Sequence, residues 1–253
     1  MKIEKIKKVG SKYKIILENN DIISTYDEVI INNNIVYKKE LNEELINKIN
    51  FETGYYDIYN KVLKYISIKL RSEYEIKMYL EKQGISIDYS KEIIKKLREN
   101  NLINDKVFVR AYIHDKLSFS NDGPYKIKKA LINHKIDSDI IEKELNNIDK
   151  SVYLEKLRKQ ILSKIKSNTK YSCGMLKQKL LNYFINLGYD GNDILFILEQ
   201  NDISNGDIIK REYDKLYNKL KNKYNGEQLK YIIKSKLYQK GFKMEEINEI
   251  LVL

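Results

Sequence analysis

The stretch LKQKLLNYFINLGY, residues 176–189, decides the fold of this chain. Three- and four-residue spacings separate its apolar side chains, as on the buried face of an amphipathic helix: Leu176, Leu180, Tyr183, Phe184 and Leu187. The pair Gly188-Tyr189 follows, and glycine readily adopts the left-handed conformation that ends a helix. The stretch therefore predicts a helix over 172–187 that ends at a glycine and packs its apolar face on a neighbour.

Pairs of this kind recur roughly every fifty residues. They lie 51, 53 and 53 residues apart, at Gly84-Ile85, Lys135-Ile136, Gly188-Tyr189 and Gly241-Phe242. An apolar pair follows each of them at matching offsets, shifted by a three-residue insertion in the first copy: Ile93 and Leu97, Ile141 and Leu145, Ile194 and Leu198, and Ile247 and Leu251. Such a period is typical of units that bury their apolar faces only by stacking on neighbours. Stacked units present long surfaces to large partners, which favours a binding protein.

From residue 57 onward the spacing predicts helices only. We expect them at 58–70, 73–83 and 89–100; 105–117, 124–134 and 138–147; 151–166, 172–187 and 191–200; and 206–222, 226–240 and 244–252. The expected division is a segment 1–50 followed by repeats 51–103, 104–149, 150–203 and 204–253. The predicted fold class is therefore mainly α: a curved solenoid of four tandem three-helix repeats, preceded by a small β-hairpin or antiparallel sheet.

That N-terminal sheet is predicted from a change of period. Apolar and polar residues alternate from Tyr13 to Leu17, a turn is expected at 19–21, and the apolar pattern resumes at Ile22-Ile23. A second turn is expected at 32–34, before the apolar residues 35–37.

Several helix ends carry recognisable signals. Asn42 is a candidate N-cap for a short helix through Ile49. Ser72 and Glu75 form an S-x-x-E capping box, in which each side chain satisfies a free backbone donor. Pro124 suits the first turn of a helix, where its missing N–H costs nothing.

The composition limits the classes of protein to which this chain can belong. The 253 residues carry a net charge of +11, of which 1–50 contribute +1, 51–150 contribute +3 and 151–253 contribute +7. A/T-rich codons also favour lysine, isoleucine, asparagine and tyrosine, but they do not explain why the charge gathers toward the C-terminus. No apolar run reaches the roughly 20 residues of a membrane span, and none near Met1 resembles a signal peptide. The single cysteine, Cys173, excludes an intramolecular disulfide and favours a reducing cytoplasm.

The usual catalytic patterns are missing from the sequence. It holds two histidines, His114 and His134, and no glycine-rich phosphate loop, Cys-x-x-Cys pair or His-Glu-x-x-His helix. One cysteine and two dispersed histidines hardly supply the four ligands of a zinc site. We therefore expect no enzyme, no metal and no cofactor.

The order and spacing of motifs in the first two repeats resemble those of the RecX family, regulators of the RecA recombinase. The residues that carry the resemblance are Lys69-Leu70-Arg71-Ser72, Glu75, Leu80, Gly84, Leu97, Asn101-Leu102-Ile103-Asn104-Asp105, Phe108, Tyr112, Gly123-Pro124, Ile127 and Leu131. The resemblance is clearest over 60–145 and continues in period through residue 253, as in the longer, four-repeat members.

Three positions depart from the family pattern. Val109 replaces an alanine, Ala130 a frequent glutamate, and Lys135 a glycine. Because a left-handed residue other than glycine is strained by about 1 kcal/mol or more, we expect the helix before Lys135 to end differently.

The resemblance implies a non-enzymatic, monomeric modulator. Such proteins lie along the groove of the RecA filament on single-stranded DNA and inhibit strand exchange, ATP hydrolysis and cleavage of the SOS repressor. Some members also bind DNA directly, single-stranded and in some cases double-stranded.

Two lysine-rich stretches are the candidate contact surfaces, because bases that reach phosphates give salt-dependent affinity and aromatic rings stack on unpaired nucleobases. Residues 155–179 carry a net charge of +7 and residues 210–243 a net charge of +8. Tyrosines 171, 183, 213, 217, 224, 231 and 238 are interleaved with them. The candidate RecA- or DNA-binding residues are Lys156, Arg158, Lys159, Lys164, Lys166, Lys170, Lys177, Lys179, Lys230, Lys234 and Lys236, together with Lys69 and Arg71 of the family motif.

The two basic stretches are also compatible with other interpretations. The same bases suit an acidic protein surface, or they form a solvated helix face with tyrosines packed inward. The leading hypothesis is the RecA-filament modulator. The second is a stand-alone DNA-binding protein that competes for strands, and the third is a scaffold for an unrelated protein.

Overall fold

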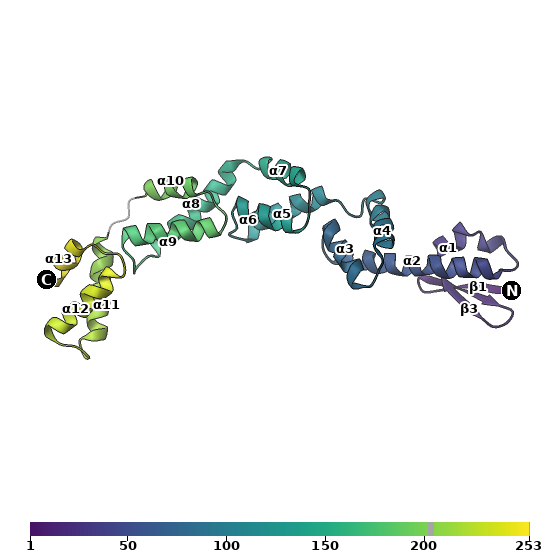
Figure 1. Cartoon of the computed structure of the whole chain (residues 1–253), viewed down its shortest axis with the longest axis horizontal. Helices are drawn as coiled ribbons and strands as arrows, with labels where there is room; N and C mark the ends of the chain where they lie inside the picture. The colour runs from purple at the N-terminus through teal and green to yellow at the C-terminus, as the bar shows by residue number, and fades with distance from the viewer. Residues whose placement is uncertain (202–204, 253) are drawn as a thin grey trace. The chain divides into compact units, whose positions relative to one another are not determined.

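The computed structural model describes residues 1–201 and 205–252 and is mostly helical, with one three-stranded sheet (Figure 1). This confirms the predicted class, mainly α with an N-terminal antiparallel sheet. The chain divides into two compact units, Met1–Asn104 and Asp105–Leu253. Each unit is built around its own apolar clusters.

The sheet of the first unit is antiparallel in the order β1-β2-β3, with β1 at Ile3–Val9, β2 at Lys12–Leu17 and β3 at Ile22–Thr25. The predicted β2–β3 hairpin is confirmed, with Ile15 opposite Ile23. Strand β1, the short helix α1 (Asp27–Asn32) and the 3-10 helix η1 (Ile35–Tyr37) were not predicted. Apolar side chains from all these elements form one cluster, which lies against helix α2.

Helix α2 is continuous over Glu43–Ile68, so the prediction of two separate helices on either side of residue 57 is wrong. The predicted N-cap is confirmed, since the Asn42 side chain accepts a hydrogen bond from the backbone N–H of Leu45 at 2.9 Å. One buried stripe serves two cores. Ile49 packs in the sheet cluster, whereas Val62 packs with helices α3 and α4. A helix that supports two cores has a tertiary reason to continue where its local pattern is weak.

Helices α3 (Glu73–Lys82) and α4 (Ile87–Glu99) complete the first unit. The predicted capping box of Ser72 and Glu75 is present, with both reciprocal hydrogen bonds. Gly84 follows α3 with φ +73°, the left-handed conformation expected for it.

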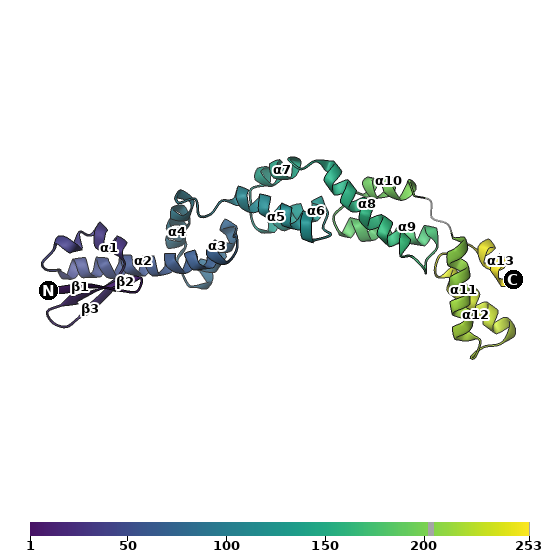
Figure 2. The same cartoon turned by 180° about the vertical axis from the view of Figure 1, so that it is seen from behind.

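The second unit contains three successive sets of three helices (Figure 2). They are α5 (Asp105–Phe119), α6 (Pro124–Asn133) and α7 (Ser138–Asn146); α8 (Lys150–Lys166), α9 (Cys173–Asn186) and α10 (Gly191–Glu199); and α11 (Gly206–Leu220), α12 (Gly226–Tyr238) and α13 (Met244–Val252). Their starts and ends lie close to the predicted ones, and Pro124 occupies the first turn of α6 as expected.

The helix before Lys135 ends differently in one hydrogen bond, although it keeps the left-handed turn. The N–H groups of Ile85, Tyr189 and Phe242 each donate to the carbonyl five residues earlier, whereas among the described residues no such bond joins Ile136 to Leu131. Lys135 has φ +55° and occupies the same left-handed position as Gly84, Gly188 and Gly241 in the other copies. Its backbone N–H donates to the carbonyl oxygen of Ile132 at 2.9 Å. The local turn is therefore kept, and Lys135 bears the conformational strain.

Two backbone joints connect consecutive sets in the second unit. The N–H of Gly123, at the start of α6, donates to the Leu187 carbonyl at the end of α9 over 2.6 Å. One set further on, the N–H of Ser172 donates to the Lys240 carbonyl after α12 over 3.1 Å. Gly188 lies so close that an added Cβ would be 2.4 Å from the backbone nitrogen of Lys126. This close approach requires glycine at position 188.

Candidate nucleic-acid and filament interface

Three lysines and two tyrosines gather on helices α8 and α9 and the segment between them. The Nζ of Lys164 lies 4.2 Å from the ring centre of Tyr183, while the Nζ atoms of Lys170 and Lys179 lie 5.0 and 4.7 Å from that of Tyr171. Lys179 and Tyr183 are one turn apart on α9 and share a face. The five residues therefore form one continuous surface, called here the basic–aromatic cluster.

The segment between α8 and α9 fixes the position of Tyr171. The Asn168 side-chain oxygen accepts hydrogen bonds from the backbone N–H groups of Lys170 (3.3 Å) and Tyr171 (3.1 Å). Its amide group donates to the Tyr171 carbonyl at 2.7 Å. Ser172 is buried and caps α9 by accepting a hydrogen bond from the N–H of Met175 at 3.3 Å. The cluster therefore rests on an ordered connection rather than on a free loop.

The charge of the cluster has no acidic counterpart in its own part of the sequence, because residues 156–189 contain no Asp or Glu. Lys166 is exposed and Lys177 is half-buried within the same stretch. Tyr183 is 40% exposed, which leaves part of its ring accessible. Lysines held beside accessible rings combine phosphate contact with nucleobase stacking, the chemistry used to bind single strands.

Lys156 has a different environment from the other candidates. Its side chain is half-buried, and Nζ donates to the carbonyl oxygens of Lys116, at 3.1 Å, and of Leu117. Burial lowers the pKa of Lys156 below its ordinary value. Its ammonium group thus caps the C-terminal turn of α5, where lysine is favoured by the helix dipole.

Arg71 is also engaged within the protein. Its guanidinium carbon lies 4.0 Å from the Tyr65 ring centre, its side chain is 14% exposed, and it contacts Glu75 at 3.4 Å. Lys69 contacts the same carboxylate at 3.4 Å but is mainly exposed. Arg71 therefore supports the start of α3 in the first unit.

The other candidates on α8 are exposed and only weakly held. Arg158 donates to the side-chain oxygen of Gln200 at 3.3 Å, and Lys159 pairs with Glu155 at 2.8 Å. Exposed contacts of this kind contribute little to stability, so both side chains remain available to a partner.

Helix α12 carries a second basic surface. Lys230 pairs with Glu227 at 3.4 Å, Lys236 is exposed and Lys234 is half-buried. Tyr231 and Tyr238 are 73% and 61% exposed. Together with Lys234 they lie at helical spacings of three and four residues, which places these three on one face.

Sequence reasoning selected the lysines but not the rings that organise them. In the sequence, Tyr171 and Tyr183 are aromatics interleaved with lysines, and the four-residue step from Lys179 to Tyr183 is the signal that places these two side chains on one helix face. Lys240, counted among the bases of the C-terminal stretch, is half-buried and paired with the buried Glu212. No local pattern distinguishes it from an exposed lysine.

Among residues 1–201 and 205–252, no three His, Cys, Asp or Glu side chains are grouped as metal ligands would be. No helix in the described part of the chain is long and apolar enough to cross a membrane. His114 is exposed and lies 4.0 Å from Asp115.

Tandem three-helix units behind an N-terminal sheet define an α-helical repeat protein. Two family models match its units: the first three-helix domain of RecX over residues 59–98, and the second three-helix domain of RecX over residues 104–145. The regulatory protein RecX of Streptococcus agalactiae serotype III (strain NEM316) is 31% identical over 256 residues, which cover 99% of this chain and 98% of that protein. That of Lactococcus lactis subsp. cremoris (strain MG1363) is 30% identical over 264 residues, 99% and 97% of the two chains. The chain belongs to the RecX family, as the motifs of its first two repeats indicated.

Solved structures agree on the fold. A crystal structure of regulatory protein RecX superimposes with a TM-score of 0.68 at 23% identity, covering 79% of this chain and all of that one. RecX from Lactobacillus salivarius gives a TM-score of 0.54 at 28% identity, covering 58% of this chain and 95% of the other.

Proposed function

We propose that this chain binds the RecA filament on single-stranded DNA, along the filament groove, and lowers strand exchange, ATP hydrolysis and SOS-repressor cleavage. It acts as a cytoplasmic monomer, without catalysis of its own. The observation that supports this most is the basic–aromatic cluster, whose lysines and rings suit a phosphate backbone with unpaired bases. The relatives are named regulatory proteins, which favours a modulator over an enzyme.

Membership of the family supplies the partner in this proposal, and the structure supplies the candidate contacts. The contact residues are proposed in two groups. The primary group is the basic–aromatic cluster with its neighbours Lys166 and Lys177, and the secondary group is Lys230, Lys234 and Lys236 on α12. Arg158 and Lys159 flank the primary group on α8, and Lys69 is the candidate in the first unit. The proposed domain division is the segment 1–50 followed by the repeats 51–103, 104–149, 150–203 and 204–253.

ATP turnover by RecA from the same organism, on single-stranded DNA, tests the proposal. Adding the wild-type chain is expected to slow turnover in proportion to occupancy. The double variant Lys164→Glu/Lys179→Glu is expected to require a much higher concentration, because it places two carboxylates beside the phosphates.

A matched control carries the same change of charge elsewhere in the second unit: Lys129→Glu/Lys143→Glu, at two exposed positions on α6 and α7. It is expected to act like the wild type. Unchanged turnover and unchanged filament lifetime at saturating wild-type protein would refute the proposal. If both double variants lose the same amount of inhibition, the cluster contributes only through its net charge.

The second candidate function is direct DNA binding that competes with RecA for strands. The basic–aromatic cluster favours it, with Lys164 beside the accessible ring of Tyr183 and two further lysines beside Tyr171, because that chemistry needs no second protein. Affinity for a single strand without RecA should then fall with salt, with a slope of about 0.7 per phosphate contact. Failure to retard single strands at low salt would exclude it.

A further inference from the structure

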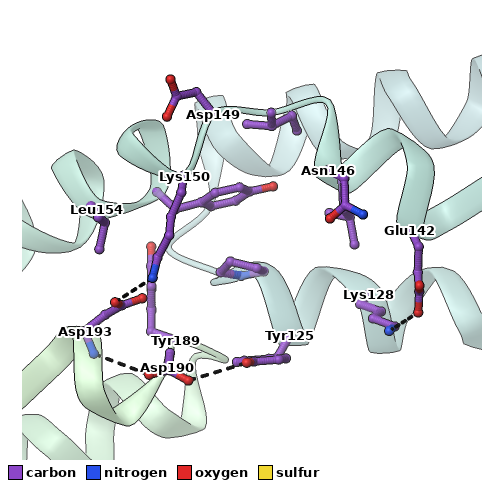
Figure 3. Close-up of a pocket in the computed structure, with 14 residues that line it drawn as sticks. Tyr125, Lys128, Glu142, Asn146, Asp149, Lys150, Leu154, Tyr189, Asp190 and Asp193 are labelled. Carbon is purple, nitrogen blue, oxygen red and sulfur yellow. Dashed lines mark hydrogen bonds and ion pairs between the residues drawn. The ribbon is translucent and has the colours of Figure 1, made fainter.

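A cavity of about 680 Å³ lies in the second unit, between α6, α7, the start of α8 and the start of α10 (Figure 3). Three tyrosines, Tyr125, Tyr153 and Tyr189, line it together with Pro124 and aliphatic side chains. It lies apart from the basic–aromatic cluster, with which it shares no residue.

The cavity is acidic in an otherwise basic protein. Its lining holds four carboxylates and two ammonium groups, a net charge of −2, whereas the whole chain carries +11. Two of the carboxylates are neutralised by ion pairs, Lys150 with Asp193 at 2.8 Å and Lys128 with Glu142 at 2.7 Å. The Asp193 carboxylate raises the pKa of Lys150, which keeps that ammonium charged.

Asp190 retains binding capacity after these pairs are formed. One of its oxygens caps α10 by accepting from the N–H groups of Asn192 (2.8 Å) and Asp193 (3.4 Å). Among the described residues, the other oxygen meets only a long contact of 3.5 Å from the Tyr125 hydroxyl. Both side chains are seen at the floor of the cavity in Figure 3. A carboxylate oxygen of this kind can accept a stronger, charged donor.

Tyr153 gives an independent indication of a ligand. It lines the cavity and is 7% exposed, and its hydroxyl has no hydrogen-bond partner among the described residues. Burial raises the pKa of Tyr153, so the group stays protonated. A buried polar group without a partner destabilises the folded state, and native structures keep few of them. A ligand that carries N–H donors would satisfy it.

We propose that this cavity binds an arginine side chain presented by a basic segment of a partner protein. A guanidinium group is flat, stacks on tyrosine rings and offers several N–H donors at once. Those donors match the free oxygen of Asp190 and the hydroxyl of Tyr153. The net charge of −2 left after the two ion pairs disfavours phosphates, which sets this cavity apart from a nucleic-acid site. The inference rests on the cavity alone and stands whether or not the RecA proposal holds.

A titration of the full isotope-labelled chain, followed by two-dimensional amide NMR, tests the inference without any partner protein. The probe is a blocked pentapeptide with a central arginine between glycine and serine residues, used up to about 10 mM because a single side chain binds weakly. Saturable shifts are expected at the amides of Asn192, Asp193 and Ser151. The same peptide with citrulline, which has the shape of arginine without its charge, should produce little shift.

Two variants and one control complete the test. Asp190→Asn keeps the helix cap, because asparagine and aspartate cap equally well, and should raise the dissociation constant about fivefold or more. Tyr153→Phe should also weaken binding while leaving the spectrum folded. Lys164→Glu/Lys179→Glu should bind the peptide like the wild type. Equal shifts from the citrulline peptide, no saturable shift in the wild type, or unchanged affinity in both cavity variants would overturn the inference.

Discussion

Substitution of Lys156 by methionine tests whether this lysine caps helix α5. Methionine keeps most of the apolar stem, so the change removes the ammonium group and its hydrogen bonds to the carbonyls of Lys116 and Leu117. Hydrogen bonds that involve a charged group contribute about 1.5–3 kcal/mol each. Part of this gain is offset by the cost of burying the ammonium, which the lowered pKa of Lys156 reflects. We expect a net loss of about 1.5–3 kcal/mol, since two bonds are lost and one desolvation cost is relieved.

Urea unfolding followed by circular dichroism measures this loss. The control is Lys159→Met, three residues along the same helix, whose pair with Glu155 is exposed on both sides. An exposed pair of this kind contributes at most about 0.5 kcal/mol, so the control should unfold like the wild type. The reasoning is refuted if Lys156→Met stays within about 0.5 kcal/mol of the wild type. It is also refuted if the two variants lose equal stability.

Three further predictions concern the helix ends and the buried tyrosines. Lys135→Gly removes the strain of a left-handed lysine and should raise the free energy of unfolding by about 0.5–1 kcal/mol. Its control, Lys129→Gly inside α6, should lower the free energy of unfolding by about 0.5–1 kcal/mol. A loss of stability in Lys135→Gly would contradict the left-handed conformation of residue 135. Gly188→Ala combines a backbone clash with a φ of +86° and should cost about 2–5 kcal/mol. Its control, Gly174→Ala in open space on α9, should be neutral or slightly stabilising in the same urea assay; similar stability of the two would show that the joint tolerates a side chain. Burial raises the pKa of Tyr189 from 10.0 to about 12, so its contribution to stability is complete below pH 10 and is lost as the pH rises through about 12. The urea midpoint should therefore fall less between about pH 9 and about pH 11 in Tyr189→Phe than in the wild type. An equal fall in the two proteins would exclude this tyrosine as the cause.

How much of the candidate site could be read from the sequence depended on the residue. The sequence places Lys164, Lys170 and Lys179 in one lysine-rich stretch, but their contacts with two tyrosines emerge only when α8 and α9 lie side by side. Lys156 looked like any other lysine of α8, because the carbonyls that it caps are about forty residues earlier in the chain. The acidic cavity was not predicted, since its lining comes from four helices and no local motif marks it.

The sequence by itself determined the local features: where the helices of the second unit begin and end, the capping box at Ser72, the repeat period and membership of the RecX family. These depend on spacings of three or four residues and on backbone chemistry near each helix end, which act over short distances. Only the tertiary structure decided that α2 runs unbroken through two cores, that Lys135 keeps the left-handed turn, and which charged side chains are buried. These outcomes depend on packing and desolvation by residues distant in the chain, and the free energy of burying a charge is set by the neighbours that the fold supplies.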